Sequence, residues 1–74
     1  MKELTHKDWM KNPTPREMWV WNNDEEVMVK RYVLYILTDE ERKRFCSHPV
    51  MTPDHNYIHC AEIEEETKND FNHI

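Results

Sequence analysis

The stretch EMWVWNNDEEVMVKRYVLYIL, residues 17–37, carries the strongest structural pattern in the chain. Residues 18–21 form a short apolar run, and residues 27–37 are rich in β-branched and aromatic side chains, which favour strands over helices. Between them, residues 22–24 read Asn-Asn-Asp, residue types that tolerate the left-handed backbone of a tight turn in a chain without glycine. The stretch therefore predicts a β-hairpin.

Side chains alternate between the two faces of a strand, so the hairpin assigns its aromatic residues to faces. Trp19 and Trp21 share one face of the first strand, and Met18 and Val20 share the other. Both faces of the second strand become apolar toward its end, which predicts a central strand covered on both sides there. A short sheet has little to cover a second aromatic face, so one face is expected to bind a partner or a second copy of the chain.

A short helix is predicted in front of the hairpin, in LTHKDWMKNP. Thr5 and Asp8 have the spacing of a capping box, and Leu4 and Trp9 that of a hydrophobic staple. Pro13 prevents the helix from continuing. We expect the helix to dock on the strands, because so short a helix is not stable alone.

Two further strands are predicted after the hairpin, over residues 44–51 and 57–63. Thr38 and Glu41 offer a second capping box, but a polar turn is preferred for residues 38–41, leading into a strand that Pro49 keeps short or at an edge. The predicted fold is mainly β: a small antiparallel β-meander or an SH3-like or Tudor-like barrel, with a short N-terminal helix. A plain three-stranded sheet under the helix is the alternative. Residues 1–66 form the predicted domain, and residues 67–74 a polar C-terminal tail.

Length and composition limit the functions that fit. A core in 74 residues supplies only about 3–5 kcal/mol of net stability unless a disulfide, a metal or a partner adds to it. The longest apolar run, residues 32–37, is too short for a membrane span, and no signal peptide is recognised. Two cysteines without a secretory signal indicate a reducing cytoplasm.

The net charge of −5 is unevenly distributed. Acidic and basic residues balance over residues 1–53, and the excess lies in residues 54–74, where only Lys68 is basic. This acidic end disfavours simple binding to a phosphate backbone and suits a partner with a basic groove. The acidic residues expected to contact such a partner are Glu62, Glu64, Glu65 and Glu66.

A cluster of cysteine and histidine in FCSHPVMTPDHNYIHC, residues 45–60, raises the question of zinc. Thiolate and imidazole are the ligands of structural zinc, although the spacing here is not that of a standard zinc finger. His59 and Cys60 would also point to opposite faces of a strand, so both can bind one ion only if the strand bends. The expectation is no cofactor, with zinc as the alternative. The candidate ligands are Cys46, His48, His59 and Cys60.

Catalysis and nucleic-acid binding are weaker interpretations. Cys46, His48 and Asp54 could form a nucleophilic set, but so small a domain has little room for a pocket that excludes water, and we expect no enzyme. Basic residues at 30–31 and 42–44 could line a surface that binds nucleic acid, with aromatic side chains on which bases stack. The acidic residues 39–41, beside the second basic cluster, argue against this interpretation.

The hairpin followed by CAEIEE resembles a small domain of unassigned chemistry encoded by phages and prophages of gut bacteria, and the LTHKDWMKN helix is similar to a segment that often accompanies it. The resemblance covers about residues 4–65. It implies a phage accessory protein that acts in the cytoplasm of a bacterial host. The matching positions are Met18, Val20, Trp21, Asn22, Asp24, Lys30, Arg31, Val33, Ala61, Glu62 and Ile63.

Together these observations predict a non-enzymatic protein that binds a host bacterial protein and inhibits or modulates it, of the anti-defence or anti-CRISPR class. A small nucleic-acid-binding β-domain and a zinc-stabilised adaptor are the alternatives, a homodimer is a further possibility, and no membrane contact is expected. Aromatic residues and methionine, which are enriched at interfaces, supply the candidate contacts. The aromatic ones are Trp19, Trp21, Tyr32 and Tyr35.

Overall fold

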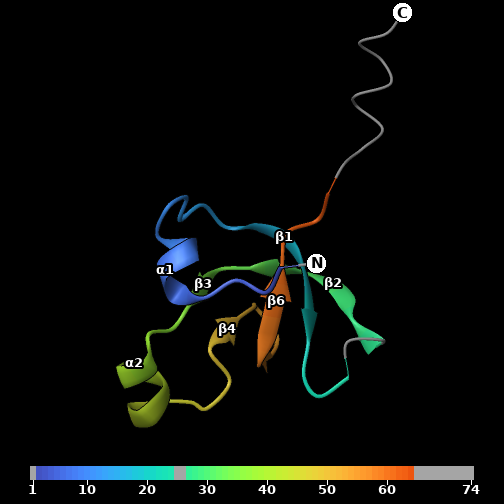
Figure 1. The fold of residues 1–74 in the computed structure, drawn as a ribbon. Helices are drawn as coiled ribbons and strands as arrows, with labels where there is room; N and C mark the ends of the chain where they lie inside the picture. The colour runs from blue at the N-terminus through green and yellow to red at the C-terminus, as the bar shows by residue number, and fades with distance from the viewer. Residues whose placement is uncertain (1, 25–26, 65–74) are drawn as a thin grey trace, which may run out of the picture.

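The computed structural model describes residues 2–24 and 27–64, which form two antiparallel three-stranded sheets and two short helices (Figure 1). The first sheet has the order β2-β1-β6 and the second the order β3-β4-β5. The predicted small, mainly β fold with a short N-terminal helix is confirmed, and the sheets are open, so they do not form a closed barrel. The elements are α1 (His6–Trp9), β1 (Arg16–Trp21), β2 (Val29–Val33), β3 (Tyr35–Ile36), α2 (Asp39–Arg44), β4 (Val50–Met51), β5 (Asn56–Tyr57) and β6 (His59–Ala61).

The predicted hairpin is present as β1 and β2, in a register that places Met18 opposite Arg31 and Val20 opposite Val29. Two expectations about it were wrong. The central strand of this sheet is β1, because β6 pairs with its other side, and β2 is an edge strand. The tight left-handed turn expected at residues 22–24 is not formed by them, because none of these three residues has a positive φ, and β2 begins only at Val29.

The strand predicted over residues 27–37 is interrupted at Leu34 and continues as β3 in the other sheet. The Leu34 N–H donates to the carbonyl oxygen of Met51 at 2.8 Å, which ties the corner to β4. Because the alternation of side chains is reset at this corner, Val33 and Ile36 both face the core although they are three residues apart. One continuous segment therefore contributes a strand to each sheet.

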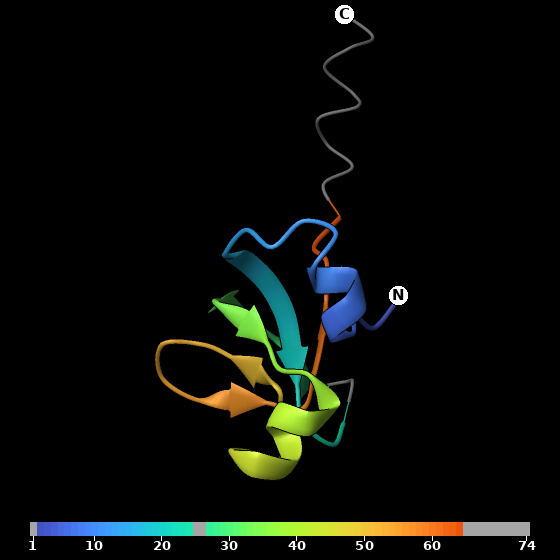
Figure 2. The ribbon, with the colours of Figure 1, turned by 90° about the vertical axis from the view of Figure 1, so that its left-hand side faces the viewer.

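Both helices lie on the side of the molecule away from β2 (Figures 1 and 2). Helix α1 begins at the predicted capping box, in which the Asp8 N–H donates to the Thr5 hydroxyl and the Thr5 N–H donates to the Asp8 carboxylate. The hydrogen bond from the Thr5 N–H, and to a lesser extent one from the Thr5 hydroxyl to the same carboxylate, lower the pKa of Asp8. Trp9 is buried, as expected for a helix held by tertiary packing.

The polar turn predicted at residues 38–41 is wrong, because this segment begins helix α2. Thr38 and Glu41 form the capping box that the sequence also allowed, and the hydrogen bond from the Thr38 N–H lowers the pKa of Glu41. Acidic residues in the first turn and basic residues in the last complement the helix dipole. These local effects stabilise α2, in which no residue is buried.

The last two predicted strands are shorter than expected. Of residues 44–51 only β4 is a strand, because the preceding segment completes α2 and then turns, with the His48 N–H donating to the Cys46 sulfur at 3.4 Å. The strand predicted over residues 57–63 is divided at Ile58 into β5 and β6, which belong to different sheets.

The core lies between the sheets and α1 and joins side chains from nearly every element. The partly buried residues packed against it include Leu4 and Val29. Among the described residues, no helix is long and apolar enough to cross a membrane. The predicted tail, residues 67–74, lies outside the described ranges. The core residues are Trp9, Met18, Val20, Val33, Ile36, Val50 and Cys60.

Candidate protein-binding face

The outer face of the β2-β1-β6 sheet carries the aromatic residues that the sequence assigned to one face of the hairpin. Met18 and Val20 are fully buried on the core side of β1, so Trp19 and Trp21 point away from the core. Tyr32 lies opposite Glu17 and Lys30 lies opposite Trp19, which places both β2 residues on the same outer face. The register thus gathers side chains from two strands on one surface.

Trp19 and Lys30 form a cation–π contact at the centre of this face. The Lys30 Nζ atom lies 5.1 Å from the centroid of the Trp19 ring. Tyr32 is the diagonal cross-strand neighbour of Trp19, a separation within reach of aromatic side chains, and it is 51% exposed. We name Trp19, Lys30 and Tyr32 the aromatic platform.

Trp21 is predicted to contact a partner, but only 8% of its surface is exposed. It lies opposite His59 of β6, and the two rings stack with centroids 5.3 Å apart and an interplanar angle of 29°. The Nδ1 atom of His59 is in turn hydrogen-bonded to the carboxylate of Glu3. Trp21 therefore packs within the protein and leaves Trp19 and Tyr32 as the accessible aromatics of this face.

Tyr35 lies in the other sheet, apart from the platform. Its hydroxyl donates to Glu41 at 3.2 Å, and its ring meets His6 edge-on at a centroid distance of 5.6 Å. Loss of solvent around the hydroxyl, together with Glu41, raises the pKa of Tyr35. These contacts assign Tyr35 to the packing of α1 and α2 against β3.

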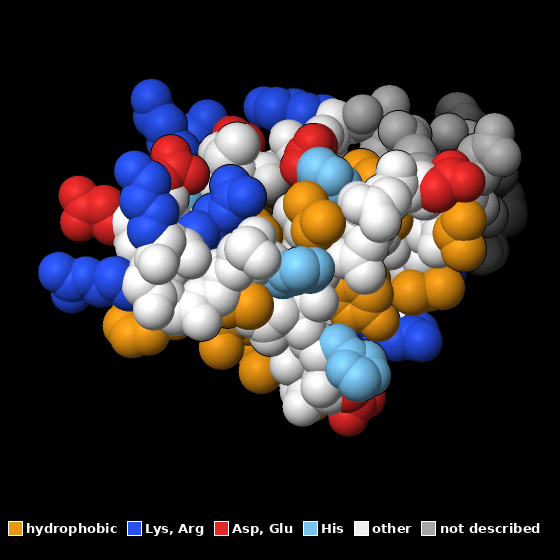
Figure 3. All heavy atoms as spheres, turned by 90° about the horizontal axis from the view of Figure 1, so that it is seen from below, with side chains coloured by type: hydrophobic (Ala, Val, Ile, Leu, Met, Phe, Trp, Pro, Cys, Tyr) orange, Lys and Arg blue, Asp and Glu red, His pale blue; other side chains and the backbone are white. Residues whose placement is uncertain are grey.

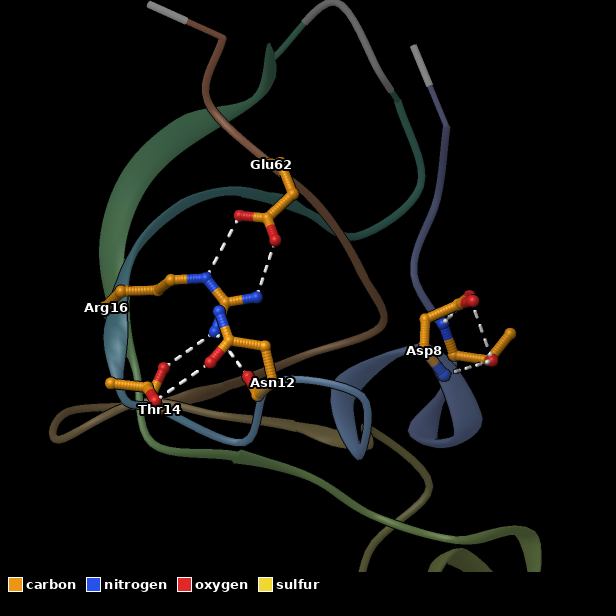
Figure 4. A network of polar contacts seen from close by, with 6 residues as sticks. Asp8, Asn12, Thr14, Arg16 and Glu62 are labelled. Atoms are coloured by element: carbon orange, nitrogen blue, oxygen red, sulfur yellow. Dashed lines mark hydrogen bonds and ion pairs between the residues drawn. The ribbon is translucent and has the colours of Figure 1, made fainter.

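Glu62 belongs to a polar network centred on Arg16 (Figure 4). The Arg16 Nε and Nη2 atoms donate to the two carboxylate oxygens of Glu62 at 3.0 and 2.5 Å, a bidentate pair that raises the pKa of Arg16. Nη1 donates to the carbonyl oxygens of Asn12 and Thr14 at 2.8 and 2.7 Å. The network holds the loop before β1 against the segment after β6, so Glu62 is engaged within the chain.

The other acidic residues expected to contact a partner are Glu64, Glu65 and Glu66. Glu64 is exposed. Glu65 and Glu66 lie outside the described residues.

The four candidate zinc ligands are not brought together. Cys60 is fully buried in the core, whereas His59 points to the outer face of the same sheet, as the alternation of a strand requires. Burial raises the pKa of the Cys60 thiol to about 12, which opposes the thiolate that a metal needs. Over residues 2–24 and 27–64, no three His, Cys, Asp or Glu side chains are grouped to hold an ion, and the histidines seen in Figure 3 stand apart.

The two basic clusters lie at opposite sides of the molecule. Lys30 and Arg31 are on β2, whereas residues 42–44 are in the last turn of α2, at the other side in Figures 1 and 2. Figure 3 shows Lys and Arg side chains gathered at the end that carries α2. Phe45, which follows the last turn of α2, is 74% exposed. This separation disfavours one continuous groove for a nucleic acid.

The sequence did not indicate the roles of two residues on this face: Lys30, which contacts Trp19, and His59, which stacks on Trp21. Lys30 was considered only as a phosphate contact, and His59 only as a metal ligand. The hairpin pattern already placed Lys30 and Tyr32 on one face, but the pairing of β6 with β1 joins segments about forty residues apart and left no local signal.

Comparison with protein-family models, with curated proteins and with solved structures found no match to this chain. The aromatic platform is therefore the basis on which a function can be proposed.

Proposed function

We propose that this protein is a non-enzymatic binding domain that contacts a protein partner through the aromatic platform. The single observation that carries the proposal is the placement of Trp19, Lys30 and Tyr32 together on the outer face of the β2-β1-β6 sheet. Trp and Tyr are the residue types most often responsible for binding energy at interfaces. Here they stand on paired strands, so little conformational entropy is lost when a partner binds.

The class of partner follows from the resemblance of the hairpin to the phage and prophage domain. On that basis the protein is a phage accessory protein, and the partner is a host bacterial protein in the cytoplasm that it inhibits or modulates, as anti-defence and anti-CRISPR proteins do. A second copy of the chain is the alternative occupant of the platform. The distance between the two basic clusters supports a protein partner over a nucleic acid.

The proposal is tested by affinity capture from a lysate of the bacterial host, with and without nuclease, using the tagged protein and two variants. Trp19→Ala removes the centre of the platform and should weaken capture of the partner at least tenfold, a loss typical of a central interface aromatic. Phe45→Ala is the matched control, because it removes an exposed aromatic at the other side of the molecule and should leave capture unchanged.

Three outcomes would contradict the proposal. One is full capture of the same protein by a folded Trp19→Ala variant. Another is capture that nuclease abolishes, which would favour the nucleic-acid-binding alternative. The third is equal loss in both variants, which would show that the platform is not the site.

A further inference from the structure

Strand β2 presents an open edge directly beside the aromatic platform. It pairs with β1 on one side only, and among the described residues no backbone hydrogen bond covers its other side. One carbonyl oxygen of the strand, that of Lys30, accepts a hydrogen bond from the Arg31 Nη1 atom at 2.7 Å, which an added strand would have to displace or share. The opposite edge of the same sheet is protected, because Glu3 bridges to Ala61 and the Leu4 N–H donates to the carbonyl oxygen of Cys60 at 2.8 Å. An uncovered edge offers unpaired N–H and C=O groups to another strand.

The side chains of this edge are basic and exposed. Lys30, Arg31 and Tyr32 are exposed in succession, and no described residue of β2 is acidic. Lys30 points to the platform face, and Arg31, opposite Met18, points to the other face. A strand added beside β2 would therefore meet a positive charge on each of its faces, although the chain as a whole carries a net charge of −5.

We propose that the partner binds by adding an extended acidic segment as a fourth strand along β2. This inference rests on the proposed function and specifies the chemistry of the partner. Backbone hydrogen bonds along the five residues of β2, about 17 Å, would supply affinity. Carboxylates facing Lys30 and Arg31 would set the register, since opposite charges across paired strands are stabilising.

A second copy of the chain fits this edge less well. An antiparallel pair of β2 strands related by a two-fold axis at the middle of the strand places Arg31 opposite Arg31. Like charges directly opposite one another destabilise a strand pair. Charge complementarity therefore favours an acidic segment of another protein over self-association.

The first test uses the ¹⁵N-labelled full-length chain and a blocked eight-residue peptide of alternating Glu and Val, with the Lys and Val peptide as the matched control. We expect the acidic peptide to shift the amide resonances of residues 29–33 and to slow their hydrogen exchange, and the basic peptide to do neither. Arg31→Glu should weaken acidic-peptide binding about tenfold. Because Arg31 points away from Trp19, this variant keeps the three side chains of the platform and removes only the hydrogen bond to the Lys30 carbonyl oxygen.

The inference is overturned if the acidic peptide causes no change at millimolar concentration, which would leave Lys30 and Arg31 as guards against edge pairing. Equal effects of the two peptides, stronger binding of an oligothymidine, or a concentration-dependent dimer in sedimentation would overturn it as well. The lysate capture separates the two proposals. Loss of capture in Trp19→Ala with full capture in Arg31→Glu would retain the platform and reject the added strand.

Discussion

Trp21 and His59 lie directly opposite each other on β1 and β6, and their rings are stacked 5.3 Å apart. This contact joins segments about forty residues apart and continues through His59 to Glu3 near the start of the chain. It also separates two tryptophans that share one face of β1: Trp21 is buried by the protein itself, and Trp19 remains accessible to a partner.

Replacement of Trp21 by alanine should therefore lower the free energy of unfolding, because Trp21 packs within the protein and does not contact the partner. Loss of a buried tryptophan costs about 3–5 kcal/mol in the free energy of unfolding, which is comparable to the whole stability of so short a chain. Urea unfolding followed by circular dichroism measures the loss. Trp19→Ala is the control and should cost about 1–2 kcal/mol, because its ring is only partly buried. Similar losses in the two variants would contradict the assignment of Trp21 to packing.

Arg16 should contribute more to stability than its partner Glu62. Arg16→Ala removes the bidentate pair and both hydrogen bonds to the loop carbonyls, and we expect a loss of about 1–2 kcal/mol. Glu62→Gln removes only the charge of a partly exposed carboxylate, and its expected cost is below about 1 kcal/mol. Urea midpoints of the two variants compare these losses. A larger loss in Glu62→Gln would show that the carbonyl contacts contribute little.

The two capping boxes should make the protein sensitive to acid. Because folding lowers the pKa of Asp8 and of Glu41, the stability they supply is fully present above their unfolded values, near 3.8 and 4.5. It is lost as the pH falls through the lower folded-state values. The melting temperature should decline over this range, and the double variant Asp8→Asn, Glu41→Gln should start lower and decline less steeply. An unchanged slope in that variant would assign the acid sensitivity to other carboxylates.

The two cysteines should differ in their reaction with iodoacetamide. Cys60 is fully buried and its pKa is raised to about 12, so almost no thiolate forms near pH 8. Cys46 is only half-buried and should be alkylated in the folded protein. Mass spectrometry should find one modified cysteine in native buffer and two in urea. Modification of Cys60 in native buffer would show that the core opens readily.

Removal of metal should leave stability unchanged, because the zinc alternative needs a Cys60 thiolate that the core disfavours. The measurement is the melting temperature with and without a strong chelator such as EDTA. A melting temperature that falls by several degrees with the chelator and recovers when zinc is added would support zinc binding by Cys46, His48, His59 and Cys60.

Local patterns predicted the hairpin and α1 because their determinants are close in sequence. The Thr5 and Asp8 capping box and the alternation of residues 18–21 are both contained within a few residues. Helix α2 begins at the capping box of Thr38 and Glu41, but this local signal competes with a polar turn leading into a short or edge strand over residues 44–51. In the structure that strand begins only after Pro49, and the preceding segment is free to be helical.

Long-range pairing explains most of what the sequence did not reveal. The corner at Leu34 and the division at Ile58 depend on β4 and on β1, which lie elsewhere in the chain, and neither break is marked by glycine or proline. The same holds for the face of the sheet: the alternation placed Trp19 and Trp21 together, but only the pairing of β6 with β1 shows that Trp21 is covered.

The segment from Val29 to Ile36 has a mechanical consequence because it belongs to both sheets. Its residues cannot leave one sheet without straining the corner that anchors the other, so the sheets should open as one cooperative unit. A ligand bound along β2 would then slow hydrogen exchange at the distant amides of β3 and β4. The exchange rate of the Ile36 amide would fall when a strand binds beside Lys30. Binding at the edge of β2 would thus reduce the opening of both sheets.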